Sequence, residues 1–368
     1  MRGGAAGWAV LCVALLALGC GDDDAGGVDG GGVDAGGGVD GGGVDAGGSV
    51  DAGGVDAGGG ADAGVDPEAA YFPPSVSWRQ PVDEAPLDDE SEAVIGWLEG
   101  ADGWGNGNTF QIDFSIEVLP RAGAEPRAFT PTGDHYSPDC DTDPVPVPPG
   151  GRLEGEEGYA CAGDGDCHLI VWDAAGETLW EMWRADIEGE TFAGGCLAVW
   201  DTARDYGDVG RGLDCTSADA AGLPIAPLLF TADEVASGEI RHAIRFILPN
   251  GRIRNRVYVP PATHSTGATD GADDAPPYGA RLRLRADYPV ESLPSEGARV
   301  VARALQRYGM ILADAGQIAL TAQSDRLTTA KWEDLLGPRD LSDLEVGDFE
   351  MVRAGERRTF TGDCVRVD

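Results

Sequence analysis

The sequence predicts a mainly β fold, a β-sandwich or barrel-like core with one or two packed helices, behind a disordered N-terminal tether. Three observations predict it. Several segments alternate apolar and polar residues with the period of a half-buried strand, one long segment has the period of a helix, and a tract rich in glycine and aspartate precedes them all. We therefore divide the chain into a signal peptide at 1–19, a tether at 20–67 and one β-rich extracytoplasmic domain at 68–368.

The N-terminus resembles a bacterial lipoprotein signal. Arg2 precedes an apolar stretch that ends at Leu18, is too short to span a bilayer, and is followed by Gly19 and Cys20. The resemblance implies cleavage before Cys20 and lipidation of that cysteine, and Gly21 in place of aspartate favours the outer membrane. We expect a lipid-anchored protein of the outer membrane or cell surface, since several acyl chains together attach a protein stably. An ordinary secretory signal with an incidental cysteine is the alternative.

The tether is a repetitive tract. From Gly21 to Asp66 the chain repeats Gly-Gly-Val-Asp-Ala-Gly with small variations, contains eleven aspartates, and has no lysine, arginine or aromatic residue. Such a composition cannot bury enough apolar surface to offset its chain entropy, so we expect disorder and a span of about 35 to 40 Å. A calcium-binding β-roll is the alternative, but the Val-Asp pairs recur every five or six residues instead of every nine.

The net charge of the chain disfavours some classes of binding partner. The net charge is −38, of which the tether contributes −11, so the remaining domain is also acidic. Nucleic acid and anionic lipid surfaces are poor partners for it. We expect no nucleic-acid partner, membrane contact through the lipid anchor alone, and a monomer. The fingerprints of dinucleotide and nucleotide sites are missing, and no cofactor is expected.

Six cysteines remain once the signal peptide and Cys20 are set aside. An even number in an exported chain predicts three disulfides, and the local pairs Cys161 with Cys167 and Cys196 with Cys215 are the first expectation. No Cys-x-x-Cys occurs, so no metal site is predicted. The six predicted disulfide cysteines are Cys140, Cys161, Cys167, Cys196, Cys215 and Cys364.

Strand signals recur along the domain. The clearest is the alternation at 110–118, and the segments 167–173 and 178–184 flank a turn typical of a hairpin. Further strands are expected at 239–248, 257–259 and 281–285.

Helix signals are fewer. Ser295 is a suitable N-cap for a helix whose apolar stripe of Val301, Leu305 and Tyr308 ends at Gly309. A second hairpin is expected from 310–313 and 317–321, followed by a short helix at 331–336.

Several blocks of sequence carry a family resemblance. The chain is similar to an uncharacterised family of secreted bacterial proteins that share these blocks in this order. The resemblance implies no particular activity. It covers roughly residues 140–320 and rests on PVPVPPGGRLEG, the Asp166-x-His168 segment, TSADAAGLPI, GEIRHAIRF, PATH and RYGMILADAG.

Three of the four histidines lie in these blocks. We hypothesise that His168, His242 and His264 converge with Asp166 and Glu239 on one polar, catalytic site that binds a metal or transfers protons. The two carboxylates could form the pair of glycoside hydrolysis, one as the acid and the other as the nucleophile or base. The alternative is that each histidine is structural, because His242 lies on the apolar face of its strand. No Gly-x-Ser-x-Gly motif supports a serine hydrolase.

Arginines and tryptophans are the candidate ligand-binding residues. The segment 241–307 contains eleven arginines against six acidic residues, and Arg241, Arg245 and Arg283 lie on polar strand faces where they could bind anionic groups. Trp183 offers an aromatic face for a sugar. The alternative is that the arginines pair with the protein's own acidic residues.

These observations favour a surface lipoprotein whose domain binds extracellular polysaccharide. A glycoside hydrolase or a polysaccharide lyase is the candidate enzyme class. The competing class is a non-enzymatic cell-envelope or adhesion module with structural histidines. A long acidic tether behind an acylated cysteine suits a large or fixed target better than a diffusing metabolite.

Overall fold

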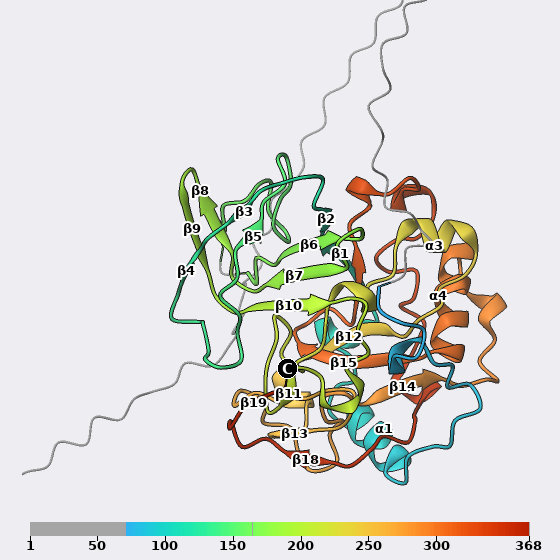
Figure 1. Cartoon of the computed structure of the whole chain (residues 1–368). Helices are drawn as coiled ribbons and strands as arrows, with labels where there is room; N and C mark the ends of the chain where they lie inside the picture. The colour runs from blue at the N-terminus through green and yellow to red at the C-terminus, as the bar shows by residue number, and fades with distance from the viewer. Residues whose placement is uncertain (1–70, 164, 368) are drawn as a thin grey trace, which may run out of the picture. The chain divides into compact units, whose positions relative to one another are not determined.

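The computed structural model describes residues 71–163 and 165–367, which form a β-rich fold with several sheets and few helices (Figure 1). The predicted fold class is confirmed. The predicted signal peptide, the lipidation site Cys20 and the tether lie outside the described residues. Within the described part of the chain, no helix is both long and apolar enough to cross a membrane.

The larger sheet has six strands in the order β1, β16, β12, β15, β14, β17. Its strands are mixed in direction: β12 runs parallel to β15 and β1 runs parallel to β16, whereas β14 is antiparallel to both of its neighbours. The bounds of the strands are β1 Ile112–Ile116, β12 Ile244–Leu248, β14 Arg281–Leu284, β15 Met310–Ala315, β16 Leu320–Gln323 and β17 Phe349–Met351.

One predicted hairpin is wrong. Strands β15 and β16 are close in sequence, but β12 lies between them and pairs with each. The turn after β15 therefore passes over β12 instead of joining two neighbours, which the short connection alone could not reveal. The predicted strands at 239–248, 257–259 and 281–285 correspond to β12, to β13 (Val257–Tyr258) and to β14.

The second sheet has four strands, β10 (Leu197–Asp201), β7 (Thr178–Met182), β6 (Leu169–Asp173) and β2 (Val118–Pro120), in that order. The predicted hairpin of β6 and β7 is confirmed. Both faces of this sheet are buried, because alternate side chains enter two different hydrophobic clusters. Ile170 and Trp172 join the main core, while Leu169 and Val171 join a smaller one.

Short strand pairs complete the β structure. They form three two-stranded sheets and one three-stranded sheet. Their members are β3 (Pro126–Arg127) with β5 (Val145–Pro146), β11 (Gly212–Leu213) with β19 (Val365–Arg366), β13 with β18 (Arg358–Thr359), and β4 (Thr130–Pro131) with β9 (Thr191–Gly194) and β8 (Asp186–Glu188).

The helices are short, and two of them begin at capping residues that the neighbouring sequence supplies. Helix α4 (Glu296–Arg307) begins at the predicted cap, where the Ser295 hydroxyl accepts a hydrogen bond from the Ala298 amide, and it packs on β14. Helix α3 (Ala232–Ser237) begins with a capping box of Thr231 and Glu234. In Figure 1, α3 and α4 lie to the right of β12 and β15. The remaining helices are α1 (Ser91–Gly100) and α2 (Gly105–Asn108), and the predicted final helix is a single 3₁₀ turn at Trp332–Asp334.

All six predicted cysteines form disulfides. Cys161 pairs with Cys167, as expected from their proximity. The expected pair of Cys196 with Cys215 is wrong: Cys196 bonds Cys140, and Cys215 bonds Cys364, which is 149 residues away in sequence. Three disulfides in one chain are typical of an extracytoplasmic protein.

Candidate functional site

A row of polar side chains crosses one face of the six-stranded sheet. Asp113 of β1 pairs in register with Thr321 of β16, and the pairing of Phe246 with Leu320 places Arg245 of β12 opposite Thr321. Residues directly opposite one another project from the same face. The Arg245 guanidinium donates to the Thr321 hydroxyl at 3.3 Å. The adjacent β12 residues Ile244 and Phe246 enter the hydrophobic core instead.

Arg245 joins two carboxylates at this face. Its guanidinium donates to both oxygens of Asp219, at 2.9 and 3.1 Å, and to Asp314 at 2.8 Å. Asp219 and Arg245 are buried, whereas the Asp314 side chain keeps 17% of its surface exposed. Burial and then the charge of Asp219 raise the pKa of Asp314 well above its usual value, although Arg245 opposes the shift. Burial and the charge of Asp219 thus favour the protonated form of Asp314, whose side chain is partly exposed.

A second ion pair adjoins the first. The buried His168 ring bonds the Glu154 carboxylate through Nδ1 at 2.5 Å and the Ala218 carbonyl through Nε2 at 3.0 Å. Burial lowers the pKa of His168, but Glu154 outweighs it and raises that pKa to about 10. His168 is thus a cation that donates from both nitrogens and has none free to accept a proton.

Asp166 is the exposed carboxylate of the group. It accepts a hydrogen bond from the Trp183 indole at 2.8 Å, and its carboxylate, that of Glu154 and the His168 ring have atoms within 4.8 Å of one another. Its charge also acts on Asp314, where it contributes to the raised pKa. Asp166 and Asp314 therefore belong to one electrostatic unit. We call these residues the charged cluster: Asp113, Glu154, Asp166, His168, Asp219, Arg245 and Asp314.

The cluster unites blocks that are far apart in sequence. Glu154 lies near the end of PVPVPPGGRLEG, Asp219 lies in TSADAAGLPI, Arg245 in GEIRHAIRF and Asp314 in RYGMILADAG. The fifth contribution is the pair of Asp166 and His168. Each of these segments supplies at least one charged side chain to the same place.

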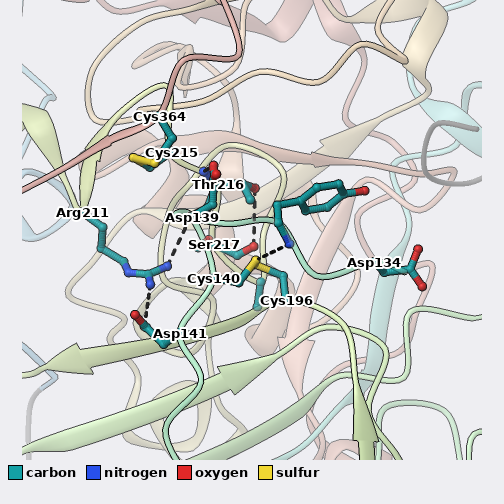
Figure 2. Close-up of a disulfide and its surroundings, with 12 residues drawn as sticks. Asp134, Asp139, Cys140, Asp141, Cys196, Arg211, Cys215, Thr216, Ser217 and Cys364 are labelled. Atoms are coloured by element: carbon teal, nitrogen blue, oxygen red, sulfur yellow. Dashed lines mark hydrogen bonds and ion pairs between the residues drawn. A yellow bond between two sulfur atoms is a disulfide. The ribbon is translucent and has the colours of Figure 1, made fainter. Parts of the chain in front are cut away.

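The loop that carries Asp219 is held from outside by a disulfide-braced segment. Figure 2 shows Asp139 and Asp141 on either side of Cys140, which is bonded to Cys196. The Asp139 carboxylate accepts a hydrogen bond from the Thr216 amide at 2.9 Å. Arg211 donates to the Thr216 carbonyl at 3.3 Å and forms an ion pair with Asp141. These contacts fix the start of the loop three residues before Asp219.

The structure brings Asp166 and His168 together but leaves Glu239 and His242 elsewhere. Glu239 forms ion pairs with Arg241 at 2.9 Å and Arg307 at 3.6 Å, at the edge where β12 and β15 begin. His242 pairs with Glu234 at 3.2 Å. Asp314 lies near the opposite end of β15, and among the described residues no hydrogen bond or ion pair joins Glu239 or His242 to the charged cluster.

His264 lies beside the Asp219 loop without touching the carboxylates. Its Nδ1 bonds the Ala220 carbonyl at 2.7 Å, and its ring meets the Phe360 ring edge-on with centroids 4.4 Å apart. Burial lowers the pKa of His264, and the hydrogen bond to Ala220 opposes that effect. His264 is accordingly a neutral ring that binds backbone.

The three predicted ligand-binding arginines occupy different surroundings. Arg245 is buried in the charged cluster, and Arg283 is buried against Glu350 and the carbonyls of residues 82, 83 and 85. Of the three, only the Arg241 side chain is largely exposed, at 74%. Trp183 is nearly buried and serves as a hydrogen-bond donor to Asp166.

Asp113, Glu154, Asp219 and Asp314 were missed as site residues by sequence reasoning. Acidic residues are so abundant in this chain that none stands out by type. A usable signal was present at Asp314, which follows four apolar residues at the end of a buried strand. A carboxylate in such a position needs a partner or a proton.

Metal binding has one candidate place in the cluster. Glu154, Asp166 and His168 have ligand atoms close enough to surround an ion, but both His168 nitrogens already form hydrogen bonds. The two other such groups among the described residues depend on cysteines that are disulfide-bonded. Comparison with protein-family models, with curated proteins and with solved structures finds no match for this chain.

Proposed function

We propose that this protein is a surface lipoprotein, anchored through Cys20, whose extracytoplasmic domain hydrolyses polysaccharide at the charged cluster. The observation that carries the proposal is that Asp314, a partly exposed carboxyl whose pKa is raised by burial and by Asp219, lies in the same cluster as the exposed carboxylate Asp166. Glycoside hydrolysis uses two carboxyl groups, one of which has a raised pKa and donates a proton.

The chemistry assigns one role to each group. Asp314 donates its proton to the glycosidic oxygen as the bond to the sugar carbon breaks. Asp166 either attacks that carbon, forming a glycosyl ester that water then hydrolyses, or removes a proton from the attacking water. In both routes one water is added across the bond, and Asp314 regains a proton for the next cycle.

The other residues around the cluster fix the positions and the protonation of these two carboxyl groups. Burial and then the charge of Asp219 favour the protonated form of Asp314, and Arg245 holds both side chains in place through hydrogen bonds. Trp183 orients Asp166 through its indole N–H. His168 cannot serve as a general base, because both of its nitrogens donate hydrogen bonds. This departs from the sequence hypothesis, in which His168 took part in proton transfer beside the carboxylates.

The nature of the target follows from charge and attachment. A net charge of −38 disfavours nucleic acid, and an acylated chain with a long acidic tether suits an extended extracellular polymer. A protein held on a membrane samples only the space near it, which a fixed glycan occupies.

The test compares carboxylates inside and outside the cluster. Reducing ends released from a panel of bacterial and algal polysaccharides are measured for the wild type and for Asp314→Asn, Asp166→Asn and Glu239→Gln. We expect the two cluster variants to lose about a hundredfold or more in kcat. Glu239→Gln is the matched control and should stay within about twofold, because its ion pairs lie outside the cluster.

A non-enzymatic adhesion or cell-envelope module is the second candidate. It is favoured by the burial of His168 and His242 in ion pairs with Glu154 and Glu234, as in structural histidines. Equal activity of the wild type and Asp314→Asn, or glycan binding by the wild type with no bond cleavage on any substrate, would replace the hydrolase proposal with this one.

A further inference from the structure

Two histidines bond the carbonyl groups on either side of Asp219. His168 donates from Nε2 to the Ala218 carbonyl at 3.0 Å, and His264 donates from Nδ1 to the Ala220 carbonyl at 2.7 Å. The two rings come from segments about a hundred residues apart in sequence. Asp219 is therefore the central residue of a three-residue stretch whose outer carbonyls are both held.

Each ring is locked in the state that the bond requires. Glu154 binds the other nitrogen of His168 and keeps that ring a cation, so its Nε2 carries a proton. His264 is kept neutral by burial, and the Ala220 carbonyl selects the tautomer with the proton on Nδ1. The charged groups that act on His264 are Asp139, Asp214 and Arg256, and those that act on His168 are Glu154, Asp166 and Arg245.

The loop also contacts the strand that carries the acid. The Ala221 amide donates to the Ala313 carbonyl at 2.9 Å, one residue before Asp314. The side chain of Asp219 reaches Arg245, which in turn binds Asp314. A shift of the 218–220 backbone would therefore change the distance between the two carboxyls directly.

We propose that His168 and His264 are positioning residues, which clamp the backbone at Ala218 and Ala220 so that Asp219 stays beside Asp314 and Arg245. The geometrical part of this inference stands without catalysis. Its consequence for turnover rests on the proposed hydrolase function. Neither histidine touches the reacting atoms.

The test uses a pair of substitutions at His264. Asparagine places an amide N–H near the position of Nδ1 and retains the donor, whereas leucine fills similar space without one. The pKa of Asp314 is measured in each variant by NMR titration of its side-chain carboxyl carbon. Because Asp219 contributes to the raised pKa, we expect His264→Leu to lower it by about one unit and His264→Asn to leave it near the wild-type value.

A control and a kinetic readout complete the design. His242→Leu removes another buried histidine, outside the cluster, and should leave the Asp314 titration unchanged. If the protein is a hydrolase, His264→Leu should lower kcat about tenfold with KM unchanged. The alkaline limb of its pH–rate profile should also move to lower pH, because the acid Asp314 would lose its proton at a lower pH. An Asp314 pKa that stays the same in a folded His264→Leu variant overturns the clamp. The titration needs no substrate, so a failed hydrolase proposal would be recognised separately.

Discussion

Arg245 is the buried cation of the charged cluster, and its replacement by methionine leaves two carboxylates without their common partner. The guanidinium makes two hydrogen bonds to Asp219, one to Asp314 and one to Thr321. Removing one member of a buried ion pair costs about 3 to 5 kcal/mol, because the remaining charge loses its compensation. We expect Arg245→Met to lower the free energy of unfolding by about this amount at neutral pH.

The loss should become smaller in acid. Arg245 is the group that opposes the raised pKa of Asp314, so that pKa rises further in the variant. A carboxyl whose folded-state pKa lies above its unfolded value stabilises the fold below the unfolded pKa and loses that contribution as the pH rises through the folded one. The stability of the variant should therefore approach that of the wild type as the pH falls toward about 4, the usual pKa of an aspartate, because a protonated Asp314 no longer needs a cation.

Urea denaturation at the two pH values measures both effects, provided that the slope of the transition is unchanged. Arg283→Met is the matched control. Arg283 is also buried, but it pairs with one carboxylate, Glu350, which retains Arg285 at 3.6 Å. The pH dependence of its stability loss should be weaker. A loss below about 1 kcal/mol for Arg245→Met, or a loss with the same pH dependence as the control, would refute this account of the cluster.

Three further predictions concern the frame around the cluster. Replacing Cys215 and Cys364 by serine opens a loop of 149 residues and should lower the free energy of unfolding by about 5 kcal/mol, as measured by thermal unfolding. Replacing Cys161 and Cys167, which close a short loop, should lower it by only about 2 kcal/mol. The folded-state pKa of His168, about 10, predicts a stabilising contribution of a few kcal/mol that is complete below about pH 6.5 and lost as the pH rises through about 10. The free energy of unfolding, measured by urea denaturation at a series of pH values, should therefore fall over this range in the wild type, and His168→Gln should remove that fall. Gly222→Ala should lower stability by about 1 to 3 kcal/mol, because φ is +74° there and a Cβ would lie 2.6 Å from a backbone carbonyl oxygen. Equal losses of stability for the two disulfides would contradict the first prediction, and an unchanged pH dependence in His168→Gln would contradict the second. A Gly222→Ala variant as stable as the wild type would contradict the third.

Local patterns predicted the elements that are locally determined. The hairpin of β6 and β7 and the start of α4 at Ser295 were predictable because the turn and the cap lie within a few residues of the elements they define. The predicted hairpin of β15 and β16 is wrong because a strand from 66 residues earlier in the sequence, β12, lies between them. Strand order depends on pairings between distant segments, and alternation within one strand carries no information about its neighbours.

The candidate site was predictable only in part. Asp166 and His168 were found because they are two residues apart in one block, and the structure keeps them together. Glu239 belongs to another block but lies at the opposite end of the parallel strands from Asp314. The chemical state of Asp314 could not be predicted, because its pKa depends on burial and on the distance to Asp219.

The sequence by itself determined the residue types available and their local geometry: an acidic, repetitive N-terminal tract, an even number of cysteines in the domain, and strands with recognisable periods. Only the tertiary structure decided which charges meet. It brought Asp219, Arg245 and Asp314 from three segments into one buried group, and it separated His242 from the cluster although Arg245 is three residues away. The physical reason is that burial and proximity set the protonation of a carboxyl or an imidazole, and both arise only when distant segments pack together.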